Sequence, residues 1–418
     1  MVTIAQRMYI DGRWRDAEGD GVFDVVDPAT RKMIERVPDA SAADVRSAVD
    51  AADRAFPAWA ATPAKERGRT LARIQARLES ETEAIARLIV LENGKPFEEA
   101  KKEVAFALGY FGWFGEEARR LAGEWEPSPV PGKRLLVLRQ PVGPVAASEF
   151  LNDRCIRTNG FTGSTEIGQW IMGRAAAQLK RLSFELGGNA PSIVFDDADF
   201  EPAVAAAVAI KFLRVGGQPC ICANRIYVQT GIAARFVPAF TEAVKRVRVA
   251  PGFERGAEVG PLINEETRTK VHGLVEDAVG RGARALTGGR PLADGARADG
   301  FFYSPTVLTD VSDDMPVCRE EIFGPVAPVL TFDTEEEVLR RANDTTFGLA
   351  AYFYTRDPAR PLRVAEGLKY GLVGANDASG YTHEIPFGGF KASGLGREGG
   401  HQGIEEYTEV KSVVIGLG

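Results

Sequence analysis

Two residues of this chain, a cysteine and a glutamate, stand beside glycines in a pattern that could support covalent catalysis. Cys220 directly follows a Gly-Gly-Gln-Pro turn, and Glu185, 35 positions upstream, ends an apolar run just before Gly187 and Gly188. A thiolate is a strong nucleophile, and a carboxylate held near it can act as a base. A cysteine after a turn is more often a small buried hydrophobic residue, so the assignment depends on the other motifs of the chain.

The composition argues against several other kinds of chemistry. The net charge is −7 with both signs mixed, and no basic patch indicates nucleic-acid binding. No apolar run approaches the roughly 18 residues of a membrane span, and the N-terminus lacks the features of a signal peptide. The three histidines lack metal-ligand spacing, so we expect no metal site. Four cysteines in 418 residues do not form a disulfide framework, which indicates a reducing cytoplasm: Cys155, Cys220, Cys222 and Cys318.

The N-terminal part of the chain predicts a scaffold without chemistry. Residues 7–39 alternate short strand-like runs with turns. Apolar residues at helical spacing then predict three amphipathic helices, the first opening at Ser41, the second running from Pro63 to Asn93, and the third covering 97–121. A chain of this length is expected to form two or three domains.

Apolar strands alternate with helices through the rest of the chain, which predicts parallel sheets of the α/β kind. The turn at Gly163 and Ser164 joins one such strand to a helix. That layout can hold a phosphate at the helix N-terminus, although most such turns are only capped helices. A second α/β unit of roughly 180 residues begins at Pro191, a size typical of one domain. The last strand-like run, 409–415, is expected to pair with another strand or subunit, with 134–140 as a candidate.

Taken together, the motifs of the chain are far more specific than any one of them. Eight segments occur in one order and cover nearly the whole sequence, and with them the chain resembles the aldehyde dehydrogenase superfamily, specifically its succinate-semialdehyde dehydrogenase branch. The resemblance implies an α/β fold with two Rossmann-type parallel-sheet domains and a small oligomerisation β-extension. The segments are LENGKP (91–96), QPVG (140–143), FTGSTEIG (161–168), ELGGNAP (185–191), GQPCICANR (217–225), GPLIN (260–264), EEIFGPV (320–326) and PFGGFKASGLGREGG (386–400).

The family pattern also implies a division of the chain and its partners. Residues 1–122 and 140–187 would form the cofactor-binding domain, and 188–395 the catalytic domain. Residues 123–139 and 396–418 would be oligomerisation or bridging segments. The implied partners are a small aldehyde and further copies of the chain in a homodimer or homotetramer, with neither nucleic acid nor membrane.

The resemblance assigns catalytic roles residue by residue. Cys220 corresponds to the nucleophile that attacks the aldehyde carbon to give a thiohemiacetal and, after hydride transfer, a thioester. Glu185 corresponds to the base that activates water for thioester hydrolysis, a role suited to a half-buried carboxyl group with a raised pKa. Arg214 corresponds to the arginine that binds the substrate carboxylate, since a guanidinium pairs bidentately with that group. The alternative for Arg214 is a structural ion pair.

The implied cofactor is NAD or NADP. Glu321 and Phe323 match residues that hold the nicotinamide ribose and ring. Without the resemblance they would be an ordinary charged loop residue and a core residue. The turn under the pyrophosphate completes the expected cofactor-binding set, which is Gly163, Ser164, Leu186, Gly187, Glu321 and Phe323.

The chain departs from the family pattern in one large way. Family members continue from QPVG into a Trp-Asn-Phe-Pro segment and two helix–strand pairs, whereas here 142–147 runs straight into 148–158. About 65 residues are therefore expected to be missing between Ala147 and Ser148. The first sheet should be incomplete, with 142–147 re-paired onto 156–162. The missing segment would supply an asparagine donor to the oxyanion and a lysine for the cofactor, so we expect weakened cofactor binding and impaired activity.

Two smaller departures lie next to the cysteine. The step from Glu185 to Cys220 is one residue longer than the usual family spacing, so the helix before Cys220 must absorb an extra residue. Pro219 stands where threonine is common, which removes a backbone donor beside the nucleophile.

The leading hypothesis is NAD(P)-dependent oxidation of an aldehyde, with succinate semialdehyde to succinate as the best candidate reaction. Two other functions stay open. One is a folded but non-catalytic subunit that assembles through its tail strand and the 123–139 hairpin. The other is a cofactor-free thiol esterase, which needs only Cys220 and Glu185.

Overall fold

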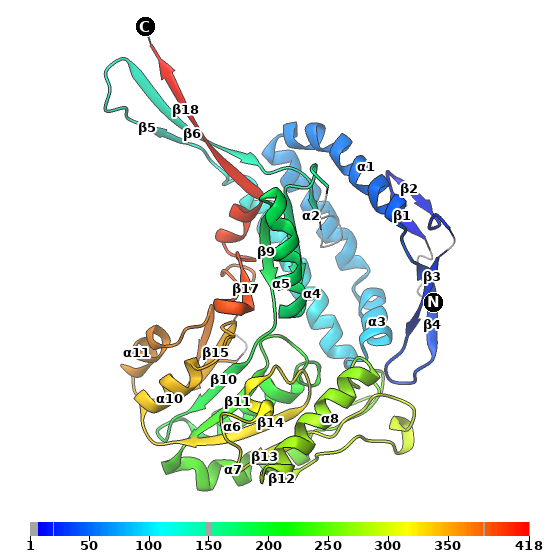
Figure 1. Cartoon of the computed structure of the whole chain (residues 1–418), viewed down its shortest axis with the longest axis vertical. Coiled ribbons are helices and arrows are strands. Elements are labelled where there is room, and N and C mark those ends of the chain that lie inside the picture. The colour runs from blue at the N-terminus through cyan, green and yellow to red at the C-terminus, as the bar shows by residue number, and fades with distance from the viewer. Residues whose placement is uncertain (1–6, 20, 147–152, 379–380, 418) are drawn as a thin grey trace.

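The computed structural model describes residues 7–19, 21–146, 153–378 and 381–417, and its largest element is a seven-stranded sheet (Figure 1). The strand order is β12-β13-β14-β11-β10-β15-β16, and every neighbouring pair is parallel except β12 with β13. The predicted α/β class is confirmed. The bounds are β10 Ala190–Val194, α6 Phe200–Val208, β11 Ala223–Gln229, α7 Thr230–Lys245, α8 Glu265–Gly280, β12 Arg284–Thr287, β13 Thr306–Thr309, α9 Pro316–Arg319, β14 Val326–Phe332, α10 Glu335–Asn343, β15 Ala350–Tyr354, α11 Arg360–Gly367 and β16 Leu372–Ala375.

The core of this unit lies on both faces of the sheet. Every residue of β10 and β15 is buried, as expected for parallel strands covered by helices on both sides. On one face the Phe236 ring stacks on that of Phe240, which lies 6.1 Å from the ring of Phe212. On the other face Phe195 and Phe332 meet edge to face. This dense packing gives the loops at the strand ends a rigid base.

A smaller, four-stranded sheet ends next to the predicted missing segment. Its order is β17-β9-β8-β7, and β8 pairs in parallel with all of β9. On its other side β8 has only β7, paired as Val145↔Thr158 and Ala146↔Asn159, so among the described residues no strand flanks 160–162 there. The two strands next to the predicted deletion thus pair with each other, while the predicted excision point lies outside the described residues. The bounds are β7 Val145–Ala146, β8 Thr158–Thr162, α5 Thr165–Ala175, β9 Arg181–Glu185 and β17 Gly394–Leu395.

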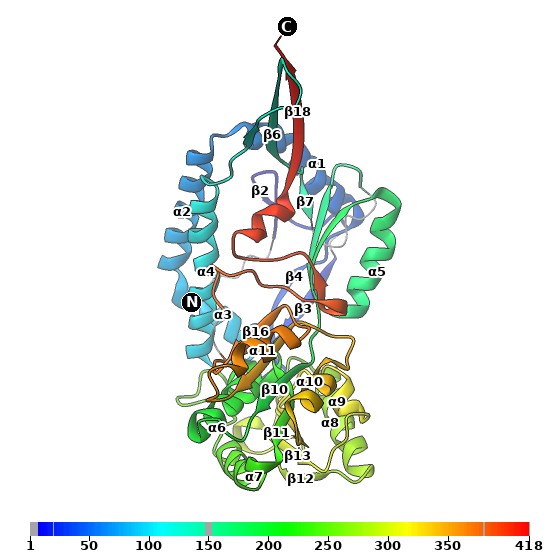
Figure 2. The same cartoon turned by 90° about the vertical axis from the view of Figure 1, so that its left-hand side faces the viewer.

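Helices α1 to α4 form the scaffold beside this sheet. Figure 2 shows α5 along one flank of the molecule, with α2 and α4 along the opposite flank. Helix α1 begins where the sequence predicts, with a capping box between Ser41 and Asp44. The bounds are α1 Ala42–Ala61, α2 Ala64–Ser80, α3 Thr82–Asn93 and α4 Phe97–Glu117, preceded by the hairpins β1 Met8–Ile10 with β2 Arg13–Arg15 and β3 Val22–Val26 with β4 Met33–Pro38.

The prediction of a single helix from Pro63 to Asn93 is wrong. The chain leaves helical geometry at Glu81 (φ −107°, ψ 8°), and α2 and α3 are separate helices. No glycine or proline marks the break, and the only local sign of a new helix start is the Ser-x-x-Glu pattern of Ser80 and Glu83. Both helices contact α4, and the break lets α2 and α3 each pack along the surface of α4.

The tail strand forms an arm with the predicted hairpin. Strand β18 pairs antiparallel with β6 from Thr408↔Pro141 to Gly416↔Lys133, which confirms the proposed partner of the last run. The arm projects from the top of the molecule in Figure 1. The outer edge of β18 faces no strand among the described residues. The bounds are β5 Glu124–Glu126, β6 Lys133–Pro141 and β18 Thr408–Gly416.

Candidate active site

Three backbone segments converge around Cys220. A Cβ at Gly188 would overlap the Cys220 carbonyl oxygen, so the cysteine backbone packs directly against the turn that follows Glu185. A Cβ at Gly217 would likewise overlap the carbonyl oxygen of Gly324. The glycines therefore bring the turns after Glu185, before Cys220 and after Phe323 together, as the sequence predicted for the first two.

The helix before Cys220 contains the predicted extra residue. Helix α6 ends at Val208 and continues as a π-helical turn, Ala209–Leu213. A π turn holds one more residue than an α turn and is frequent at functional sites. The chain then passes through Val215, which has a φ of 42°, a strained value for a β-branched residue. The extra residue is thus accommodated without moving Cys220 away from Gly188.

Glu185 is a buried carboxyl group at the end of β9. Its side chain is 4% exposed, and Oε2 has no hydrogen-bond partner. Burial raises the pKa of Glu185 to about 9; the neighbouring Glu398 carboxyl adds to the rise and Arg397 opposes it. A carboxyl group with this pKa holds a proton at neutral pH and can exchange it with a nearby thiol or water.

The Cys220 thiol is partly exposed, and burial around its sulfur raises its pKa to about 12. The carboxyl groups of Glu321 and Glu185 contribute to this rise, because a thiolate would be repelled by them. The resting group is therefore a neutral thiol. It needs a proton acceptor when it reacts.

Alkylation is expected to select Cys220 and Cys155. Cys222 and Cys318 are only 4% and 2% exposed, so iodoacetamide should spare them in the folded protein. Because the pKa of Cys220 is raised, its labelling rate should climb about tenfold per pH unit between pH 7 and 9. Peptide mass spectrometry checks both points, with Cys220→Ser as the control that leaves only Cys155 labelled. A rate at Cys220 that does not change with pH would show that the thiolate is already formed.

The residues expected at the nicotinamide side lie together. Glu321 Oε1 accepts a hydrogen bond from the Gly188 N–H at 2.9 Å, and Gly187 leaves just enough room for Oε2. Leu186 donates its N–H to the Ser393 carbonyl and packs against Gly168 of α5. Phe323 has a φ of 57°, unusual for a bulky residue and typical of positions fixed by function.

The phosphate turn is present, but its surroundings are open. Ser164 caps α5 by accepting from the Ile167 N–H, and both Gly163 and Ser164 are exposed. Ile167 and Trp170 on the same helix are 47% and 50% exposed, and beyond β8 the sheet has only the two residues of β7. The nicotinamide side therefore fits an NAD(P) cofactor. On the side where the adenosine part of the cofactor would bind, no strand beyond β7 covers the exposed face of α5 among the described residues.

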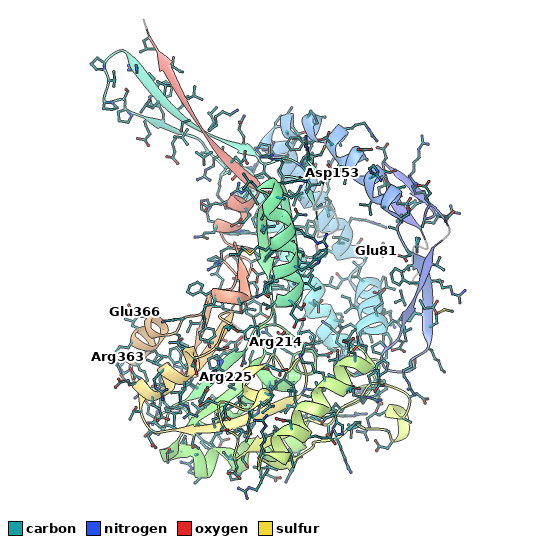
Figure 3. All side chains as sticks on the ribbon, viewed as in Figure 1. Glu81, Asp153, Arg214, Arg225, Arg363 and Glu366 are labelled. Carbon is teal, nitrogen blue, oxygen red and sulfur yellow. The ribbon has the colours of Figure 1, made fainter. Side chains whose placement is uncertain are left out.

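Arg214 reaches the same region from the turn before Cys220, and Figure 3 shows it at the junction between the seven-stranded unit and the rest of the molecule. It forms no salt bridge with any described residue, but its charge interacts with the Glu99 carboxyl group and lowers the pKa of that group against the effect of burial. Its guanidinium carbon lies 4.8 Å from the centre of the Tyr381 ring, and Nη1 is buried without a partner. Glu99 holds the adjoining turn by accepting from the Val215 N–H at 2.8 Å. Tyr381 and Glu99 carried no motif of their own, so the sequence did not reveal them.

Lys211 is a second buried cation behind the cysteine loop. Its ammonium lies 3.3 Å from Cys222 Sγ and 3.4 Å from Asn224 Oδ1. Burial lowers the pKa of Lys211 and raises that of Cys222, so burial favours the neutral form of each group under the loop. Within the described ranges no cluster of histidine, cysteine, aspartate or glutamate could hold a metal ion, and no helix is long and apolar enough to cross a membrane.

Comparisons with known proteins show the family of the chain. The sequence model of the aldehyde dehydrogenase family matches residues 14–148 and 146–413. The chain belongs to the aldehyde dehydrogenase family. It is 40% identical to a glutarate-semialdehyde dehydrogenase of Pseudomonas aeruginosa, with 98% of each chain covered, and 40% identical to a succinate-semialdehyde dehydrogenase [NADP(+)] of Escherichia coli, with 99% and 98% covered. The crystal structure of an NADP-dependent enzyme of E. coli aligns with a TM-score of 0.96 at 39% identity, covering 99% and 98%.

The same comparisons locate the missing segment of this aldehyde dehydrogenase. The alignment with the P. aeruginosa enzyme runs over 476 residues, 58 more than the 418 of this chain, so at least that many positions face a gap. The two family matches meet at residues 146–148, beside the predicted excision at Ala147. Both findings support one internal deletion.

Proposed function

We propose that this aldehyde dehydrogenase acts on aldehydes that carry a carboxylate, with succinate semialdehyde as the first candidate. The observation that carries the proposal is Arg214, six positions before Cys220, whose buried Nη1 has no hydrogen-bond partner among the described residues. Such a group favours a carboxylate ligand. Two relatives support the choice, since their names specify the semialdehydes of glutarate and succinate.

The proposed chemistry starts at Cys220. Its sulfur bonds to the aldehyde carbon and the thiol proton passes to the carbonyl oxygen, giving a thiohemiacetal without any oxidation. NAD or NADP, when bound, supplies the hydride acceptor for the oxidation to a thioester, and Glu321 and Phe323 would hold its nicotinamide half. Glu185 then takes a proton from the water that cleaves the thioester, which releases the acid and restores the thiol.

We propose that dehydrogenase turnover is impaired in this chain. The family asparagine that donates to the oxyanion belongs to the segment that the chain lacks, and loss of one such donor typically lowers the rate on the order of 10²–10³-fold. The open adenosine side of the cradle, with Ile167 and Trp170 exposed, should weaken cofactor binding. Four free cysteines fit a reducing cytoplasm, and the intact β6–β18 arm fits a homodimer or homotetramer.

Nucleotide binding tests this proposal. Purified protein is titrated with NAD and NADP while intrinsic fluorescence and thermal unfolding are followed, with an intact relative as the reference. We expect a measurable change in fluorescence or unfolding temperature only at millimolar nucleotide, because only the nicotinamide half of the cofactor site is present. No shift at any concentration would remove the dehydrogenase function from this chain, and a micromolar response would remove the proposed weakening.

A cofactor-free thiol esterase is the second candidate. The specific observation in its favour is that Cys220 and Glu185 lie on adjoining turns that the deletion does not touch. Release of p-nitrophenol from p-nitrophenyl acetate without nucleotide, lost in Cys220→Ser, would support it.

A further inference from the structure

Arg214 is held in an unusual way. Its guanidinium carbon lies over the Tyr381 ring at 4.8 Å, and it has no carboxylate partner among the described residues. The ring attracts the guanidinium, and the Tyr381 hydroxyl also interacts with it through a hydrogen bond, so ring and hydroxyl hold Arg214 together. The buried Nη1 has no partner among the described residues and stays available for a carboxylate.

Tyr381 is itself fixed by a set of aromatic contacts. The Phe106 ring meets it edge-on with centroids 5.7 Å apart, and the Phe387 ring lies at 5.7 Å. The segment that carries Tyr381 is seated on α4, because Gly109 has no side chain where the His383 ring packs; a Cβ there would lie 2.5 Å from Nδ1. The ring is thus a rigid support for the arginine.

The stack also lies beside the reactive cysteine. Tyr381 and Cys220 are close enough for the charge of one to act on the other, and both pack, partly buried, against the core of the large sheet. On the other side of Arg214, the hydrogen bond from the Val215 N–H to Glu99 fixes the backbone of the turn. Glu99 and Tyr381 therefore restrain the backbone and the side chain of the residue that precedes this turn.

We propose that Tyr381 is a positioning residue that holds the Arg214 guanidinium ready for the carboxylate of an aldehyde bound at Cys220. This inference rests on the proposed function and deepens it, because it assigns the preference for acidic aldehydes to an aromatic ring as well as to the arginine. Loss of the ring should leave reaction at Cys220 intact for uncharged aldehydes and weaken only the carboxylate preference.

The test uses thiohemiacetal formation, which needs no nucleotide. Succinate semialdehyde and butanal have the same chain length and differ in the carboxylate. For each, the concentration that half-protects Cys220 from iodoacetamide is measured by mass spectrometry, and the ratio of the two values gives the carboxylate preference. The variants are Tyr381→Leu, Tyr381→Phe and Arg214→Gln, each checked for thermal unfolding.

The wild-type protein should prefer succinate semialdehyde. Tyr381→Leu should reduce that preference about 3- to 30-fold, the range expected for a desolvated cation–π contact, with butanal unchanged. Tyr381→Phe keeps the ring and loses the hydroxyl, so it should reduce the preference less than Tyr381→Leu, and Arg214→Gln should abolish it. If the Tyr381→Leu variant does not fold, Tyr381→Met, which also lacks a ring, takes its place.

Three results would overturn the inference. An unchanged preference in Tyr381→Leu would show that the ring does not position Arg214, and a loss in Tyr381→Phe equal to that in Arg214→Gln would assign the effect to the hydroxyl group. If protection by succinate semialdehyde and butanal is equal in the wild type, Arg214 binds no carboxylate. Absence of protection by either aldehyde is a different failure, because it removes the proposed aldehyde chemistry at Cys220 and the inference with it.

Discussion

Assayed beside an intact relative, the chain is expected to form NAD(P)H from succinate semialdehyde at least on the order of 10²–10³-fold more slowly. The reason is the absent oxyanion donor: the negative charge that develops when Cys220 attacks the aldehyde has one hydrogen bond fewer. Weak cofactor binding adds to the defect below saturation, so kcat and KM should be separated by titrating the nucleotide into the millimolar range. The glutarate-semialdehyde dehydrogenase of P. aeruginosa is a suitable reference because it aligns over 98% of each chain.

Two controls make this rate interpretable. Cys220→Ser should remove whatever activity remains, whereas Cys155→Ser should leave it unchanged, since Cys155 lies on the segment before β8 and not at the converging turns. A rate equal to that of the reference and abolished by Cys220→Ser would show that the deletion does not impair catalysis. A residual rate that survives Cys220→Ser would instead come from a contaminant.

The sequence predicted those parts of the structure that are specified locally. Apolar runs alternating with helices predicted the strands of the large sheet, and the candidate partner 134–140 of the last strand is confirmed as β6. The break at Glu81 and the stack of Tyr381 on Arg214 were missed, because both depend on contacts between segments far apart in the chain. The π turn was foreseen only as a need for one extra residue, since no side chain signals where a helix widens.

The missing segment explains why motif reasoning and structure agree so well around Cys220 and less well around the cofactor. The catalytic turns are supported by the seven-stranded sheet and by Ser393, whose hydroxyl donates to the Gly187 carbonyl at 2.7 Å. None of these supports belongs to the deleted region. The phosphate turn at Ser164 depends on a sheet that has lost its neighbours beyond β7. The sequence therefore brings the turns around Cys220 together correctly, misses Tyr381 and Glu99 beside them, and predicts the cofactor side only in part.

Replacing Glu185 by glutamine is expected to raise stability and abolish thioester hydrolysis at the same time. The folded-state pKa of Glu185 is about 9, against 4.5 for an unperturbed glutamate. Between these values the folded protein keeps the proton and the unfolded chain releases it, so this residue makes stability fall as pH rises from 4.5 to 9. Glutamine cannot ionise and removes that dependence. At pH 8 the variant should be more stable by on the order of 5 kcal/mol, and near pH 4 the two proteins should be equal.

Chemical denaturation of wild type and Glu185→Gln across pH 4–9 measures the stability difference, with Glu336→Gln on the exposed face of α10 as the control whose stability should equal that of the wild type.

Hydrolysis of the thioester is measured after acylating Cys220 with p-nitrophenyl acetate. In the wild type it should accelerate toward pH 9, because only the ionised carboxylate accepts a proton from water, and in the variant it should be slow at every pH. A variant that is less stable at pH 8 would show that Glu185 is ionised in the folded protein. Normal hydrolysis in the variant would show that another group activates the water, and Glu398, whose pKa is also raised by burial, would be the first to replace.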